Sequence, residues 1–137
     1  MKTWFPLMAA VVLMAFAAGP CFALMGIALV SKESAKEMGV EVRTQPNGPN
    51  DVWVEMEFKP EGKLKDFVHV SMEIRDGDKL LVGYAPLKEK RSDNGAVTVH
   101  FMADRAFLDK ITLRIVAGPP MDRTGFDLRL KDFVEKP

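Results

Sequence analysis

Apolar and polar side chains alternate along residues 96–117, which is the clearest pattern in the chain. Apolar residues take every second position from Val97 to Phe101, and they do so again from Ile111 to Ala117. A polar corner at 103–110 separates the two runs. Because successive side chains of a strand point to opposite faces, the stretch predicts two half-buried strands joined across a corner.

The same two-residue period recurs in five further segments, which are separated by turns rich in glycine, proline and asparagine. In the most regular of them Val54 and Met56 are predicted to face the core, with Trp53 on the opposite face. In another, Val82 and Tyr84 are predicted to share one side. The seven expected strands cover 40–44, 52–58, 67–75, 79–86, 97–102, 111–117 and 126–131.

This pattern predicts the fold class as all-β. No helical period is long enough to connect parallel strands, so an antiparallel, seven-stranded β-sandwich is expected over residues 40–134. The corner at 103–110, with Phe107 and Leu108 among charged residues, resembles the loop that plugs one end of immunoglobulin-like and fibronectin-III-like sandwiches. The resemblance is to the superfold alone. The sequence lacks the cysteine pair and corner tyrosine of immunoglobulin domains, so no function is carried over.

The amino-terminal segment has the form of a secretory signal peptide. It is uncharged from Trp4 to Val30, and its apolar run is followed by a Gly-Pro break and small residues at positions 21 and 23. We therefore predict a signal peptide at 1–23 that is cleaved after Ala23. Two alternatives are cleavage after Ala28 and an uncleaved membrane anchor that extends to about residue 30, because the uncharged stretch is long enough to span a bilayer.

The leader sets the expected compartment and domain plan. Residues 24–39 are predicted to be a short connector and 135–137 a tail. The protein is expected to be secreted or periplasmic in a bacterial envelope, with a membrane-anchored form as the alternative. Cys21 is the one cysteine, and it lies in the leader, so disulfides and thiolate chemistry are excluded from the folded domain.

Composition argues against several functions. The chain has 19 basic and 19 acidic residues, so its net charge of zero does not favour nucleic-acid binding. No nucleophile elbow, zinc-protease motif or phosphate-binding glycine loop occurs, and Asp76 is explained as a turn residue. We predict a protein that is not an enzyme and has no cofactor; a small hydrolase, which would need a pocket lined by carboxylates, is the third hypothesis.

Histidine and methionine offer the only candidate metal chemistry. His100 and Met102 share a strand face, and His69 lies on an earlier strand with Met72 predicted to point to the core. Imidazole and thioether groups suit Cu(I). A periplasmic copper carrier that uses His100 and Met102, with or without His69, is therefore the alternative hypothesis.

Trp53 and Tyr84 are the candidate binding residues. Trp53 is predicted to lie on the face of its strand opposite the apolar one, where an exposed ring can stack on a partner. The alternative is that a loop or the amino-terminal segment covers the ring. Tyr84 joins the same surface if the two strands are neighbours. The leading functional prediction is an exported, non-enzymatic module that binds protein or polysaccharide, or a structural component of the envelope.

Overall fold

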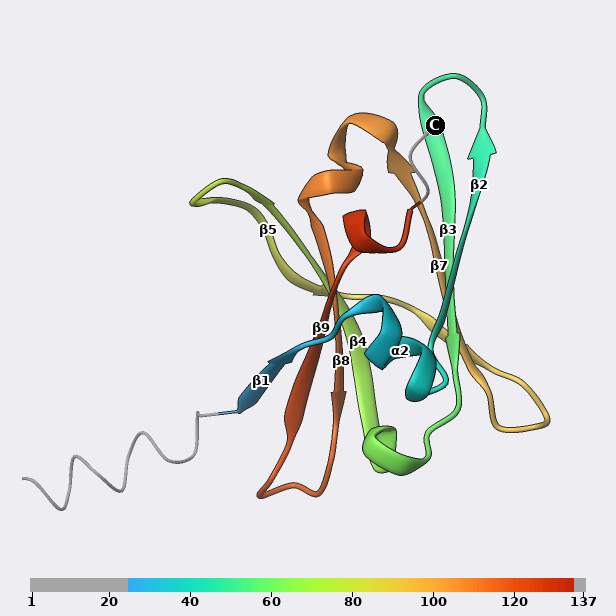
Figure 1. Ribbon diagram of the computed structural model, residues 1–137, viewed down its shortest axis with the longest axis vertical. Coiled ribbons are helices and arrows are strands. Elements are labelled where there is room, and N and C mark those ends of the chain that lie inside the picture. Colours follow the sequence, from blue (N-terminus) through green and yellow to red (C-terminus); the bar gives the residue numbers. More distant parts are fainter. Residues whose placement is uncertain (1–24, 135–137) are drawn as a thin grey trace, which may run out of the picture.

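Nine strands form two sheets that pack face to face in a computed structural model, which describes residues 25–134 (Figure 1). The five-stranded sheet consists, in spatial order, of β1 (Gly26–Leu29), β9 (Thr124–Arg129), β8 (Ile111–Ala117), β4 (Phe67–Asp76) and β5 (Lys79–Pro86). The four-stranded sheet consists of β2 (Glu41–Asn47), β3 (Asp51–Phe58), β7 (Val97–Asp104) and β6 (Glu89–Arg91). All neighbours are antiparallel except β1, which runs parallel to β9. The all-β prediction is confirmed.

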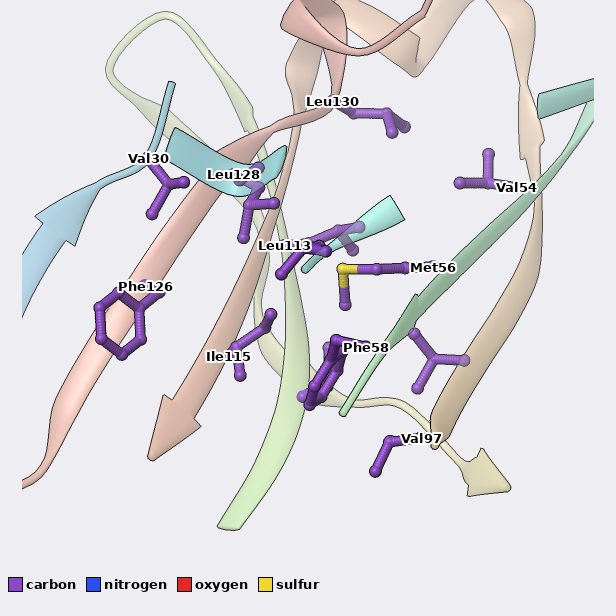
Figure 2. Close-up of a cluster of buried hydrophobic side chains, with 14 of the residues drawn as sticks. Val30, Val54, Met56, Phe58, Val97, Leu113, Ile115, Phe126, Leu128 and Leu130 are labelled. Atoms are coloured by element: carbon purple, nitrogen blue, oxygen red, sulfur yellow. The ribbon is translucent and has the colours of Figure 1, made fainter. Parts of the chain in front are cut away.

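The core lies between the two sheets and is built from the alternating apolar positions. Figure 2 shows Met56 and Phe58 of β3 pointing toward Leu113 and Ile115 of β8. All four side chains are at most 1% exposed. Burying a side chain of this size stabilises a fold by about 1.5–3 kcal/mol, so these facing pairs are a main source of the attraction between the sheets.

Short helices connect the sheets and cover the ends of the sandwich. Helix α2 (Lys32–Glu37) carries the chain from β1 to β2 (Figure 1), and it begins at Ser31, whose Oγ accepts from the Ser34 amide at 3.1 Å. Gly39, with φ at +77°, follows the helix and turns the chain toward β2. Three 3₁₀ helices complete the described fold: η2 (Gly62–Leu64), η3 (Arg105–Lys110) and η4 (Leu130–Asp132).

The structure contains two short strands that were not predicted from the sequence. Residues 24–39, expected to be a connector, contain β1 and α2, and β1 pairs with β9 over four residues. β6 has only three residues. Runs this short do not show a recognisable two-residue period, which explains why seven strands were predicted and nine are observed. The predicted signal peptide (1–23) and tail (135–137) lie outside the described residues, whereas the alternative cleavage position after Ala28 falls within β1.

Two predicted side-chain positions are wrong. Met72 of β4 pairs with Ala85, and Ile74 pairs with Val82, so β5 contains one extra residue in this interval. Such a bulge reverses the alternation, and it places Tyr84 on the face opposite to Val82. At the corner, Leu108 packs against the core as expected, but Phe107 is 38% exposed and lies beside Lys110 Nζ. Among residues 25–134, no helix is long and apolar enough to cross a membrane.

Candidate functional site

The outer surface of the four-stranded sheet carries an aromatic pair at its centre. Strands β2, β3 and β7 are neighbours, and their outward side chains form a surface that we call the Trp53 face. Trp53 lies directly opposite Met102 in the β3–β7 ladder, and its ring centroid is 5.1 Å from that of His100 with 35° between the planes. The face comprises Glu41, Arg43, Gln45, Asn47, Trp53, Glu55, Glu57, Thr98, His100 and Met102.

Trp53 is only partly covered, as the sequence leaves open. Val52 and Val54 on either side of it are 4% and 0% exposed, whereas Trp53 and His100 keep intermediate exposure on the outer face. The two rings cover one another and leave their remaining surface to solvent. An aromatic ring held against a second ring on a rigid strand is ordered before any partner arrives, so binding would cost little side-chain entropy.

Met102 extends this aromatic pair with an exposed apolar group. Its side chain is 44% exposed, one of the more exposed large apolar side chains in the described part of the chain. Asn47 Nδ2 donates a hydrogen bond to Met102 Sδ at 3.3 Å. The contact links β2 to β7 across β3 and holds the thioether near Trp53.

Acidic side chains lie beside the aromatic pair around a single arginine. Arg43 Nη1 contacts Glu41 at 3.1 Å, and Arg43 Nη2 contacts Glu55 at 3.0 Å and Glu57 at 3.6 Å. The hydrogen bond with Glu55, aided by the charges of all three carboxylates, outweighs desolvation and raises the pKa of Arg43. Three carboxylates against one guanidinium leave this part of the face negative.

The structure separates the other predicted site residues from the Trp53 face. His69 is exposed on β4 and Tyr84 lies on β5, both in the five-stranded sheet. Tyr84 therefore does not join Trp53 in one surface, and His69 does not approach His100 or Met102. Of the predicted residues, only Trp53, His100 and Met102 come together.

Tyr84 instead belongs to a polar cluster on the outer surface of the five-stranded sheet. The Arg114 guanidinium carbon lies 3.7 Å from the centroid of the Tyr84 ring. Arg114 also donates two hydrogen bonds to Asp127, at 2.6 Å from Nε and 2.9 Å from Nη2. Beside them Arg75 Nε donates to Glu73 at 2.6 Å. We call these five residues the Tyr84 cluster.

Burial and hydrogen bonding shift the pKa values of Tyr84 and Glu73 in opposite directions. Burial, a hydrogen bond with Glu73 and the charge of Asp127 raise the pKa of Tyr84 well above its ordinary value. Burial opposes ionisation of Glu73, but hydrogen bonds from Tyr84 and Arg75 and the charges of Arg75 and Arg114 outweigh it and lower the pKa of Glu73. Each charged group in the cluster has a charged partner, so the arrangement acts as a brace across β4, β5, β8 and β9.

Sequence reasoning did not find the Tyr84 cluster. Its members are outward positions of four strands, and an alternating pattern shows that such residues face away from the core without showing which strands are neighbours. Glu73 departs from the expected exposure of an outward charged residue, since it is only 6% exposed. The extra residue in β5 concealed the contribution of Tyr84.

The acidic and histidine side chains of the described residues were the candidates for metal binding and for a hydrolytic pocket. Within 25–134 no group of three or more His, Cys, Asp or Glu side chains is placed to hold a metal ion. A hollow of about 210 Å³ between the ends of α2 and β3 has Glu41, Glu57 and Glu61 among its lining residues. Glu41 and Glu57 both lie within 3.6 Å of Arg43, so these carboxylates are held in ion pairs.

Comparison with protein-family models, with curated proteins and with solved structures finds no match to this chain.

Proposed function

We propose that this protein is an exported, non-enzymatic β-sandwich module that binds a protein partner through the Trp53 face. One observation carries the proposal: the paired rings of Trp53 and His100, with the exposed Met102 beside them, lie on an open sheet surface. Tryptophan, methionine and arginine are enriched in protein interfaces, and a central tryptophan is a common hot spot.

The charges of the Trp53 face indicate the chemistry of the partner. Arg43 is surrounded by Glu41, Glu55 and Glu57. One carboxylate is enough to balance the single positive charge of Arg43, so the other two leave an excess of negative charge. The excess negative charge favours a partner with a basic rim around an apolar centre. A protein surface provides this combination more readily than a neutral polysaccharide does.

The strand order supports a finer assignment of the fold as immunoglobulin-like. The order β2-β3-β7-β6 corresponds to the A-B-E-D sheet of such domains, and β9-β8-β4-β5 corresponds to G-F-C-C′. β1, parallel to the last strand, would be an additional edge strand. We propose the immunoglobulin-like superfold on this topology, and the predicted signal peptide supports the proposal that the module is exported.

Photo-crosslinking at one position on each sheet tests the proposed interface. A photoreactive amino acid at Gln45, which pairs with Trp53 across β2 and β3, is expected to capture a partner in the producing cells. The same group at Leu80, which is 50% exposed on the other sheet, is the matched control. Trp53→Ala is expected to weaken capture from Gln45 by about 30-fold, the effect of a hot spot.

Three results would contradict the proposal: adducts from Leu80 equal to those from Gln45, adducts unaffected by Trp53→Ala, or no adduct from Gln45. Retardation of the protein in gels that contain envelope polysaccharide, abolished by Trp53→Ala, would replace the protein partner by a glycan. Folding of the Trp53→Ala variant is checked by its circular dichroism and unfolding midpoint.

A further inference from the structure

Two soft metal ligands and an aromatic ring converge on the Trp53 face. His100 and Met102 are two residues apart on β7 and point outward together. Trp53 of β3 lies opposite Met102 and within 5.1 Å of the His100 ring. This arrangement brings an imidazole, a thioether and an indole ring together on one sheet surface.

We propose that His100 and Met102 bind one Cu(I) or Ag(I) ion, with the indole ring of Trp53 covering it. Side chains at such positions start about 7 Å apart on a strand, and the methionine has three rotatable bonds with which to turn its sulfur from Asn47 Nδ2, which donates to it at 3.3 Å, toward the imidazole. Thioether and imidazole ligands select soft ions such as Cu(I). A cation held by these two side chains would lie close to Trp53, which pairs with Met102 and whose ring centroid is 5.1 Å from that of His100, so the ring quadrupole would attract it.

The surroundings favour a soft monovalent cation over harder ones. Structural Zn²⁺ sites need four ligands and Ca²⁺ sites six or more oxygens, whereas residues 25–134 present no cluster of three or more His, Cys, Asp or Glu side chains for either ion. Glu55 is the cross-strand neighbour of His100 and contributes negative charge, while Arg43 holds its carboxylate at 3.0 Å.

The chain supplies matched controls for both ligands. His100→Phe removes the nitrogens but keeps a ring against Trp53, and His69→Phe makes the same change on the other sheet. Met102→Leu removes the sulfur with little change in volume. Met121→Leu makes that change at a residue that is 86% exposed in the loop between β8 and β9.

Titration of the purified full chain with Ag(I), in buffer free of chloride and with Cys21→Ser in every variant because a thiolate also binds soft ions, tests the site through tryptophan fluorescence. The part of the signal that is absent in Trp53→Phe belongs to Trp53 and not to Trp4. It is expected to be quenched with a stoichiometry of one ion per chain. His100→Phe and Met102→Leu are each expected to weaken binding by about tenfold or more, since losing even a group that only orients a ligand costs 10–100-fold.

The two control variants are expected to bind Ag(I) as the unmodified protein does. The proposal is overturned if Trp53 shows no saturable quenching, or if His69→Phe and Met121→Leu weaken binding as much as the site variants. Anaerobic Cu(I) competition with a coloured chelator provides a second readout. The metal titration contains no partner, so its failure would leave the proposed protein interface standing, and failure of the crosslinking experiment would leave the metal site standing.

Discussion

Arg114 lies flat against Tyr84, with its guanidinium carbon 3.7 Å from the ring centroid, while two of its nitrogens bind Asp127. The contact joins β8 to β5 across the intervening strand β4, and the ion pair joins β8 to β9. Side chains of Arg114 and Asp127 are only 16% and 14% exposed. One guanidinium thus braces four of the five strands of this sheet from its outer side.

Tyr84 is expected to hold its proton far into the alkaline range. It is the only tyrosine in the chain, so the absorbance of tyrosinate near 295 nm reports its ionisation directly. Its pKa is raised in the folded state above the ordinary value near 10. The unfolded chain therefore releases this proton first, and stability is expected to fall as the pH rises above about 10. A tyrosinate midpoint at pH 10 in the folded protein would contradict the buried hydrogen bond with Glu73. Tyr84→Phe is the control, and its stability is expected to lack this alkaline decline.

The ion pair between Arg114 and Asp127 is expected to show strong coupling. Asp127→Ala leaves a largely buried guanidinium without its partner and should cost about 1.5–3 kcal/mol in the free energy of unfolding. Arg114→Met keeps the aliphatic stem while removing the charge. The double variant is expected to lose less than the sum of the single changes, as measured by urea unfolding. Additivity within about 0.5 kcal/mol would show that the pair is not energetically coupled.

Gly118 is expected to be the least replaceable glycine in the described chain. Its φ is +114°, and a Cβ at this position would lie 2.6 Å from the main-chain oxygen of Asp122. Gly118→Ala is therefore expected to cost more than about 2 kcal/mol through strain and collision. Gly48→Ala, at φ +79° with nothing within 4 Å, is the matched control and should cost about 1–2 kcal/mol from backbone strain alone. Equal losses in the two unfolding experiments would refute the close contact.

The position of signal cleavage is expected to matter for stability. Cleavage after Ala23 leaves β1 intact, whereas cleavage after Ala28 removes Gly26, Ile27 and Ala28, which pair with Thr124 to Phe126 of β9. We expect mass spectrometry of the exported protein to find an amino terminus at Leu24. A chain that begins at Leu29 is expected to unfold at lower temperature than one that begins at Leu24. Equal midpoints for the two chains would show that β1 contributes nothing to the sheet.

Much of the fold could be predicted because alternation is a local property. The apolar run from Val52 to Phe58 showed which side of β3 is buried, and the structure has those four apolar side chains at 4% exposure or less. Trp53 was correctly placed on the outer face for the same reason. Strands of three or four residues were not predicted, because a run this short shows no two-residue period. The bulge in β5 was not predicted either, because a single extra residue reverses the alternation of side chains.

The candidate site could be predicted only in part, because it depends on which strands are neighbours and in what register. The sequence predicts that His100 and Met102 share a face, because they lie two residues apart on one strand. It did not reveal that Trp53 lies against His100, since this requires β3 beside β7 with Trp53 opposite Met102. Residues that are distant along the chain meet through tertiary pairing, and the alternation within one segment does not show which strands pair or in what register.

The parallel pairing of β1 with β9 also sets the order in which the molecule can be assembled. The amide of Val30 donates to the carbonyl of Asp127 at 2.8 Å, so the first described strand is fastened to the last. β1 can form its hydrogen bonds only when β9, in the carboxy-terminal part of the chain, is available. Contacts so distant along the chain form slowly, so β1 is expected to be the last strand to join the five-stranded sheet during folding.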